Sequence, residues 1–252
     1  MGIGKTGSSS GSASSFILTT DAVLSCPVAD CGLALSSEEL FLGWTTVVHD
    51  ATDLAPFEAA LTAKELNVAS RFRRHGDRAG YVLAHGLLRR LLAAFCAVPA
   101  QELRFRTGPF GKPLLESGAL SFSISHCGST AIVAISSPEM TVGIDIERVR
   151  EIDDMETIVR RYFSPLEYAA WCAQPHSARQ QAFFRLWTRK EAVLKATGEG
   201  LQRSLSSFTV SCDMPPELLA PAPPAWSLHD LAEPAGYVGA VAAAPQPLSS
   251  TF

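Results

Sequence analysis

The spacing of apolar and polar residues along the first half of the chain predicts a mixture of strands and helices. Residues 39–48 are apolar, β-branched and aromatic, which predicts a strand. Helical spacing follows over 55–68 and over 76–96, and Pro99 ends the second helix. Three further strands are predicted at 121–125, 130–136 and 141–147, with a turn at 137–139 between the last two.

The second half repeats this order. A helix is predicted over 151–163, Ser164 and Pro165 then form an N-cap and a first helical position, and a long helix over 178–196 stops at Gly198. Strands follow at 207–211 and 237–243, separated by a proline-rich hairpin region at 214–226. Because helices followed by strands occur twice, we predict an α+β fold of two duplicated lobes related by a pseudo-two-fold axis, each a small, mostly antiparallel sheet packed with helices. We expect the lobes at 16–150 and 151–252, after a disordered Gly/Ser-rich tail at 1–15.

Composition narrows the possible functions. The 252 residues carry a formal net charge of −4, which excludes a generally basic nucleic-acid binder. The segment 64–106 is locally basic, so it could hold an anion or an acidic partner, or simply be a solvated helix face. Six scattered cysteines without a secretory signal, and no apolar run of about 18 residues, indicate a reduced, cytoplasmic protein with no membrane span.

Two segments carry candidate chemistry. Asp145 and Glu147 stand two residues apart on a predicted strand, so their side chains share a face. Trp187, Glu191 and Lys195 stand four residues apart on a predicted helix and form one stripe. Three carboxylates and an ammonium suit Mg²⁺ holding a phosphate-bearing substrate.

Each segment also has an ordinary interpretation. An acidic strand end followed by Arg148 and Arg150 is commonly a surface ion pair. Glu191 and Lys195 are spaced as a helix-stabilising pair. Gly143 would be useful if backbone or ligand must approach the strand closely.

Two further segments present groups that could bind a phosphate. The loop 107–113 contains two glycines and two prolines, and it presents Lys112 on a stiff turn. His126 follows Ser125 at the end of a strand, where it is either a structural residue or a donor to a phosphate.

Taken together and in this order, four motifs resemble the 4′-phosphopantetheinyl transferases of the larger, single-chain type. They are Phe-Gly-Lys-Pro at 110–113, Phe-Ser-Ile-Ser-His at 122–126, Gly-Ile-Asp-Ile-Glu at 143–147, and Phe-x-x-Trp-x-x-Lys-Glu-Ala-x-x-Lys at 184–195. The resemblance implies a pseudo-two-fold α+β enzyme that binds coenzyme A between two lobes. Such an enzyme transfers the phosphopantetheine arm to a serine of an acyl, peptidyl or aryl carrier domain and releases 3′,5′-ADP.

The resemblance also implies roles for residues. Mg²⁺, or Mn²⁺, would be held by Asp145, Glu147 and Glu191. Glu191 and Lys195 would be the catalytic residues. Coenzyme A would be contacted by Lys112, Pro113, Ser125, His126, Asp145 and Lys195, and near its 3′-phosphate by Arg71, Arg74 or Arg78. Gly80 and Tyr81 stand where the family commonly has a basic residue, which leaves open which arginine meets the 3′-phosphate.

The expected partners are coenzyme A and apo carrier domains, with carrier recognition through surfaces near 150–180 and a monomeric chain. Two alternatives stay open at this point. One is a non-catalytic module that binds coenzyme A or a carrier domain. The other is a Mg²⁺-dependent phosphodiester hydrolase that uses the same acidic cluster without a protein acceptor.

Overall fold

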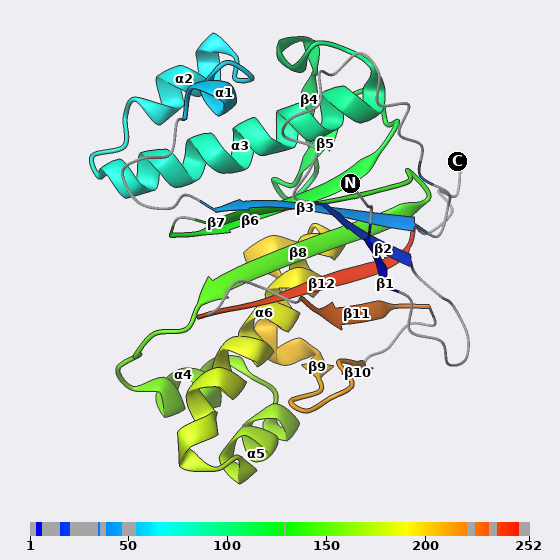
Figure 1. Ribbon diagram of the computed structural model, residues 1–252. Coiled ribbons are helices and arrows are strands. Elements are labelled where there is room, and N and C mark those ends of the chain that lie inside the picture. Colours follow the sequence, from blue (N-terminus) through cyan, green and yellow to red (C-terminus); the bar gives the residue numbers. More distant parts are fainter. Residues whose placement is uncertain are drawn as a thin grey trace. The chain divides into compact units, whose positions relative to one another are not determined.

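The computed structural model describes residues 4–6, 16–20, 35, 39–46, 54–128, 130–220, 225–231 and 236–246 (Figure 1). Contacts divide the chain into two units. Unit 1 comprises Met1–Arg106 and Pro113–Pro138, and unit 2 comprises Thr107–Lys112 and Glu139–Phe252. The division lies before the boundary expected at residue 150, because β8 (Met140–Arg148) pairs along its whole length with β12 (Tyr237–Pro245).

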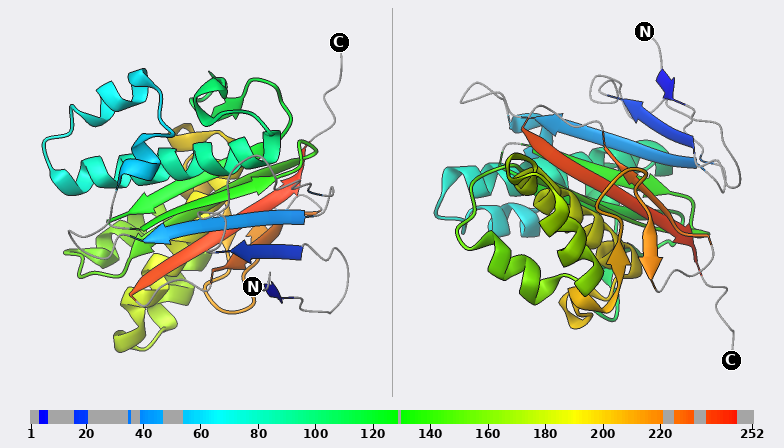
Figure 2. Two further views of the ribbon diagram at one scale, coloured as in Figure 1. Left: turned by 45° about the horizontal axis from the view of Figure 1, so that its top comes forward. Right: turned by 90° about the horizontal axis from the view of Figure 1, so that it is seen from below.

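Unit 1 is built on one five-stranded sheet. Its order is β1 (Gly4–Thr6), β2 (Phe16–Thr20), β3 (Glu39–Thr46), β7 (Thr130–Ser136) and β6 (Ser121–Cys127). Only the β2–β3 pairing is parallel among these neighbours. The long helix α3 (His75–Cys96) runs along one face of this sheet (Figures 1 and 2), with Leu83, Leu87 and Leu91 buried against it.

Smaller elements complete unit 1. The short helices are α1 (Ala55–Glu58) and α2 (Ala63–Ala69), followed after α3 by the 3-10 turn η4 (Ala100–Glu102). The strands β4 (Phe105–Thr107) and β5 (Pro113–Leu115) form a two-stranded ribbon, and the loop between them groups with unit 2.

Unit 2 is a three-stranded antiparallel sheet packed with helices. The sheet order is β11 (Ser227–Asp230), β12 and β8. The helix α6 (Arg179–Thr197) packs on β8 and β12, α5 (Pro165–Ala173) lies beside α6, and α4 (Met155–Tyr162) lies beside α5. Short elements fill the connections: η5 (His176–Ala178), η6 (Gly200–Gln202), η7 (Leu205–Ser207), β9 (Thr209–Val210) and β10 (Leu218–Ala220).

A buried ion pair fixes α6 to its neighbours. The ammonium of Lys190 donates to Glu167 Oε1 at 2.6 Å and to the carbonyl of Phe208 at 2.6 Å. Glu167 in turn accepts the backbone N–H of Val210 at 2.7 Å. Both charged side chains are fully buried, so their hydrogen bonds to α5, α6 and β9 offset the loss of hydration. They give α6 a defined position in unit 2.

The α+β class is confirmed, since each unit is a small, mostly antiparallel sheet packed with helices. The N-cap at Ser164 and the proline at the first turn of α5 are confirmed as well. The prediction of one helix over 55–68 is wrong. This stretch forms two helices, α1 and α2, because Thr62 and Glu65 form a capping box that starts α2.

Three other boundaries differ. The helix predicted at 151–163 spans only 155–162, because Asp154 adopts φ 55° before it. The strand predicted at 207–211 is only β9, since 205–207 form a 3-10 turn. Within the tail expected to be disordered, residues 4–6 form β1 by pairing with β2, while 1–3 and 7–15 lie outside the described residues.

Among the helices of the described ranges, none is both long and apolar enough to span a membrane. Four cysteines fall within these ranges, Cys96, Cys127, Cys172 and Cys212, and all four are free thiols. Cys26 and Cys31 lie outside the described residues.

Candidate active site

The site is organised by a direct backbone contact between β8 and α6. A Cβ atom built on Gly143 would lie 2.0 Å from the carbonyl oxygen of Ala192 and 2.2 Å from the nitrogen of Ala196. No side chain fits in that space. The glycine therefore allows strand and helix to touch, as the sequence suggested for this position.

Thr141 and Asp145 lie on the same face of β8 as Gly143, one on either side of it. Thr141 lies two residues before Gly143 and donates its hydroxyl to the carbonyl of Ala196. Asp145 lies two residues after Gly143 and accepts a hydrogen bond from Lys195 Nζ at 2.7 Å. Because strand side chains alternate, Thr141, Gly143 and Asp145 all face α6.

The residues of the predicted stripe, Trp187, Glu191 and Lys195, all lie on α6. Lys195 reaches across to the strand and pairs with Asp145, whose side chain is 7% exposed. Glu191 stands one turn earlier. Burial raises the pKa of Glu191 above its usual range, and the negative charge of Asp145 adds to this effect, while Lys195 opposes it.

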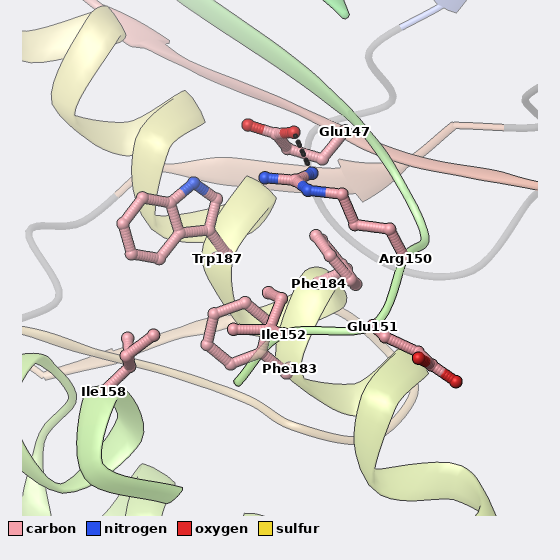
Figure 3. Close-up of a pocket in the computed structure, with 8 residues that line it drawn as sticks. All are labelled: Glu147, Arg150, Glu151, Ile152, Ile158, Phe183, Phe184 and Trp187. Atoms are coloured by element: carbon pink, nitrogen blue, oxygen red, sulfur yellow. Dashed lines mark hydrogen bonds and ion pairs between the residues drawn. The ribbon is translucent and has the colours of Figure 1, made fainter. Parts of the chain in front are cut away.

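Glu147 marks the more open end of the site. It accepts a hydrogen bond from Arg150 at 3.4 Å, and the guanidinium of Arg150 lies 5.5 Å from the ring centre of Phe184. Beside it opens a pocket of about 350 Å³ (Figure 3). The pocket is lined by Glu147, Arg150, Glu151, Ile152, Ile158, Phe183, Phe184 and Trp187. The mostly apolar lining therefore adjoins a carboxylate of the site.

The donor set of the site fits a divalent cation. Asp145, Glu147 and Glu191 offer hard oxygen ligands, and both other carboxylates raise the pKa of Glu191. A bound cation would relieve that repulsion. As the side chains stand, no three His, Cys, Asp or Glu groups of the described segments form a ready metal cluster. The fit therefore rests on charge and ligand type.

Lys112 lies at the far end of α6 from the pocket. Its ammonium donates to the carbonyl of Val142 on β8 at 2.9 Å and to the carbonyl of Ala196 on α6 at 3.2 Å. Burial lowers the pKa of Lys112 to about 8. The ammonium is thus directed at protein carbonyls within unit 2.

The remaining candidates form a second group, in unit 1. Ser125 is buried and His126 is exposed at the end of β6. A Cβ on Gly80 would lie 3.0 Å from Nδ1 of His126, so the early part of α3 adjoins this strand end. Arg78 is paired with Glu58. The other members of this group are Arg71 and Arg74, which are exposed, and Pro113, which begins β5.

Two residues of the site were not predicted from the sequence: Thr141, and Arg150 as a neighbour of Phe184. Thr141 has the same parity as Gly143, Asp145 and Glu147 on a predicted strand, so the period of two already placed it on the active face. Arg150 was considered only as a counter-charge. Its stacking on Phe184 joins residues 34 positions apart in the chain, and no local pattern signals that.

Hard oxygen donors beside an ammonium are suited to phosphoryl transfer, where positioning and charge neutralisation supply most of the catalysis. The arrangement therefore fits the class of enzymes that act on a phosphate-bearing substrate. Comparison with known proteins makes this specific. A family model described as the 4′-phosphopantetheinyl transferase superfamily matches residues 141–242, a range that contains Asp145, Glu147, Glu191 and Lys195.

Whole-chain similarity extends further. The chain is 35% identical over 217 residues to the 4′-phosphopantetheinyl transferase HetI of Nostoc sp., covering 84% of this chain and 90% of HetI. It is 37% identical over 142 residues to psf-1 of Bacillus pumilus, covering 56% of this chain and 59% of that protein. It is 31% identical over 155 residues to Sfp of Bacillus subtilis, covering 61% and 67%.

A solved holo-[acyl-carrier-protein] synthase of Thermotoga maritima is also similar, at 18% identity with a TM-score of 0.32. That match covers 42% of this chain and 64% of the synthase, and it is too low to bear on fold or function. The sequence relatives establish the family: the chain belongs to the 4′-phosphopantetheinyl transferase superfamily. It is an enzyme that transfers phosphopantetheine to carrier proteins, as the four motifs indicated, and not a non-catalytic module.

Proposed function

We propose that the chain takes the 4′-phosphopantetheine group from coenzyme A with the help of Mg²⁺ and passes it to a serine hydroxyl of an apo carrier domain. Members of the family use coenzyme A as substrate and typically a divalent metal. The observation that supports the proposal most strongly is the Asp145–Lys195 pair next to Glu191, in which Asp145 is buried and Lys195 is partly exposed. An ammonium that could bind phosphate oxygens therefore lies against carboxylates that suit a metal.

Asp145, Glu147 and Glu191 would hold the divalent ion, with Mn²⁺ as a possible substitute for Mg²⁺. When bound, the ion supplies positive charge to the pyrophosphate of coenzyme A. Lys195 adds a second positive charge. It would bind phosphate oxygens and stabilise the 3′,5′-ADP that leaves.

Glu191 would also accept the proton of the carrier serine, directly or through a water molecule. Glu191 stands one helical turn before Lys195, so a carboxylate would lie beside the ammonium that binds the phosphate oxygens. The serine oxygen then bonds to the phosphorus that carries the pantetheine, and the bond from that phosphorus to the oxygen of 3′,5′-ADP breaks. The proton ends on Glu191 and the electron pair on the departing nucleotide.

Contacts to coenzyme A are proposed from Asp145, Lys195, Pro113, Ser125 and His126, whereas the ammonium of Lys112 is held by two backbone carbonyls. For the 3′-phosphate, Arg71 and Arg74 are better candidates than Arg78. They are exposed, whereas the guanidinium of Arg78 is already paired with Glu58. A phosphate would have to displace that carboxylate before it could bind Arg78.

Carrier recognition is proposed at the pocket beside Glu147. Its lining includes Arg150, Glu151, Ile152 and Ile158, which fall in the region expected to meet the carrier. The combination of apolar and charged side chains there suits a protein surface next to the reacting serine. We expect the enzyme to act as a cytoplasmic monomer, without nucleic acid or a membrane.

Intact-mass analysis tests the function directly. The protein is incubated with coenzyme A, Mg²⁺ and several apo carrier domains, and a carrier should gain about 340 Da, the mass of the phosphopantetheine group. EDTA should stop the reaction, and added Mg²⁺ or Mn²⁺ should restore it. Cleavage of coenzyme A without any gain on a carrier would instead support the phosphodiester hydrolase.

The site assignment has its own test. Asp145→Ala and Glu191→Ala should each lose at least about 100-fold in turnover, because each removes a charge that is needed in the transition state. Glu116→Ala, which removes an exposed carboxylate of unit 1, is the matched control. Wild-type turnover by either site variant would refute the proposed metal site and leave the family membership intact.

A further inference from the structure

We propose that Lys112 is a positioning residue that clamps the last turn of α6 to β8. By doing so it would set the register in which Lys195 and Glu191 meet Asp145. The inference rests on the proposed function, because it assigns Lys112 a part in that reaction. It gives this lysine a role other than the phosphate contact that its loop suggested.

The contacts of the Lys112 ammonium point to this role. It bonds to two backbone carbonyls, Val142 O at 2.9 Å and Ala196 O at 3.2 Å, and these belong to different elements. Ala196 is in the last turn of α6, where carbonyls have no donor within the helix. A positive charge there is also favourable to the helix dipole. One side chain therefore satisfies a helix end and ties it to a strand.

The aliphatic part of the Lys112 side chain is also held in place. Gly198 caps α6 at φ 75°, and a Cβ on it would lie 3.3 Å from Lys112 Cδ. The loop itself is closed by a hydrogen bond from Gly108 N to Lys112 O at 2.8 Å. A lysine on such a turn has little freedom to leave its carbonyls for a ligand.

The same helix end has a second anchor. Thr141 donates its hydroxyl to the carbonyl of Ala196, the acceptor that Lys112 also uses. Lys195 is the residue directly before Ala196, and its ammonium pairs with Asp145 at 2.7 Å. A movement of the last turn would thus shift Lys195 against Asp145. The two anchors limit that movement.

The Lys112 ammonium is also poorly suited to a phosphate. Its surroundings are dry enough that burial lowers its pKa to about 8. The two ammonium groups also differ in their partners. Lys112 faces two backbone carbonyls, whereas Lys195 faces the carboxylate of Asp145 inside the candidate site.

Steady-state kinetics separate a clamp from a phosphate ligand. In Lys112→Met we expect kcat to fall about 10- to 100-fold, because a small misplacement of reacting groups has a large effect on rate. The KM for coenzyme A should stay within about twofold. The preference for coenzyme A over 3′-dephospho-coenzyme A should also be unchanged. Lys64→Met, which alters an exposed lysine of unit 1, is the control.

The second anchor provides an independent variant. Thr141→Val removes the other donor to the carbonyl of Ala196 and should lower kcat in the same direction, whereas Thr141→Ser keeps the hydroxyl and should restore it. Since both anchors share one acceptor, the effects of Lys112→Met and Thr141→Val should not be additive. If Lys112→Met does not fold, the Thr141 pair still decides whether anchoring Ala196 controls kcat.

Hydrogen exchange measures the clamp without any substrate. Backbone amides of residues 195–198 should exchange faster in Lys112→Met than in wild type, while α3 should be unchanged. A raised KM for coenzyme A with normal kcat, or a lost preference for the 3′-phosphate, would show a phosphate ligand and overturn the proposal. So would unchanged exchange together with unchanged kcat. If the wild type modifies no carrier, the proposed function fails, and the exchange measurement still decides the clamp.

Discussion

Gly143→Ala is the substitution whose effect follows most directly from the geometry. The added Cβ would meet the carbonyl oxygen of Ala192 at 2.0 Å, and ordinary contact begins at 3.4 Å. Both atoms belong to backbone, so no side chain can rotate away. We therefore expect β8 and α6 to separate by about 1.4 Å at this point, the difference between those two distances.

That separation should act on both activity and stability. The Lys195–Asp145 hydrogen bond, now 2.7 Å, would lengthen to about 4 Å and be lost. A misplacement of this size should lower kcat by about 100-fold. Overpacking should lower the free energy of unfolding by about 1–3 kcal/mol, or about 2–4 °C in Tm for each kcal/mol.

Two other glycines provide matched controls. Gly86 on α3 is also crowded by backbone, since a Cβ there would lie 2.7 Å from the carbonyl oxygen of Phe57, so Gly86→Ala should lose stability, though less than Gly143→Ala, and keep its kcat per folded molecule. Gly76 has nothing within 4 Å and lies on the exposed first turn of α3, so Gly76→Ala should keep kcat and leave stability unchanged or raise it by up to about 1 kcal/mol. Intact-mass rates and thermal unfolding are measured on all three variants. A Gly143→Ala enzyme with the rate of Gly76→Ala would refute the tight strand–helix contact as the basis of the site.

Two further predictions concern stability. Lys190→Met should lower the free energy of urea unfolding by about 3–5 kcal/mol, because it leaves Glu167 charged and buried without its partner. Arg160→Met, which breaks the exposed pair with Glu156, should change it little, and similar losses in both would contradict this reasoning. Burial lowers the pKa of His85 below 6.5, so the unfolded chain takes up a proton that the folded state resists. Stability should therefore be lost as pH falls through the unfolded pKa of about 6.5, more steeply in wild type than in His85→Gln, and equal slopes in urea titrations would count against the buried neutral imidazole.

The elements that carry the site could largely be predicted from the sequence. The strand at 141–147 and the helix at 178–196 have strong periodicity, and they correspond to β8 and α6 within one residue at each end. Periodicity also placed Asp145 and Glu147 on one strand face and Glu191 and Lys195 on one helix stripe. That Asp145 pairs with Lys195, however, is a contact across 50 residues, and only the fold decides it.

The role of Lys112 could not be predicted in this way. A lysine between glycine and proline on a turn is ordinarily exposed, and the sequence suggested a phosphate contact for that reason. Its surroundings are made by Val142 and Ala196, which are apolar residues that offer only backbone carbonyls. Backbone acceptors are present at every position of a chain. No residue pattern therefore signals where a buried ammonium will find two of them.

The grouping of residues 107–112 with unit 2 has a consequence for dissecting the protein. The family model matches from residue 141 onward, and a contiguous fragment cut at Glu139 would retain all three carboxylates and Lys195. It would lack Lys112, which enters unit 2 from an earlier stretch of chain. A C-terminal fragment is therefore expected to carry the carboxylates and the ammonium proposed for the metal and the pyrophosphate, and still to hold the end of α6 loosely. Supplying the 107–112 loop through a fused linker would be the way to make such a fragment complete.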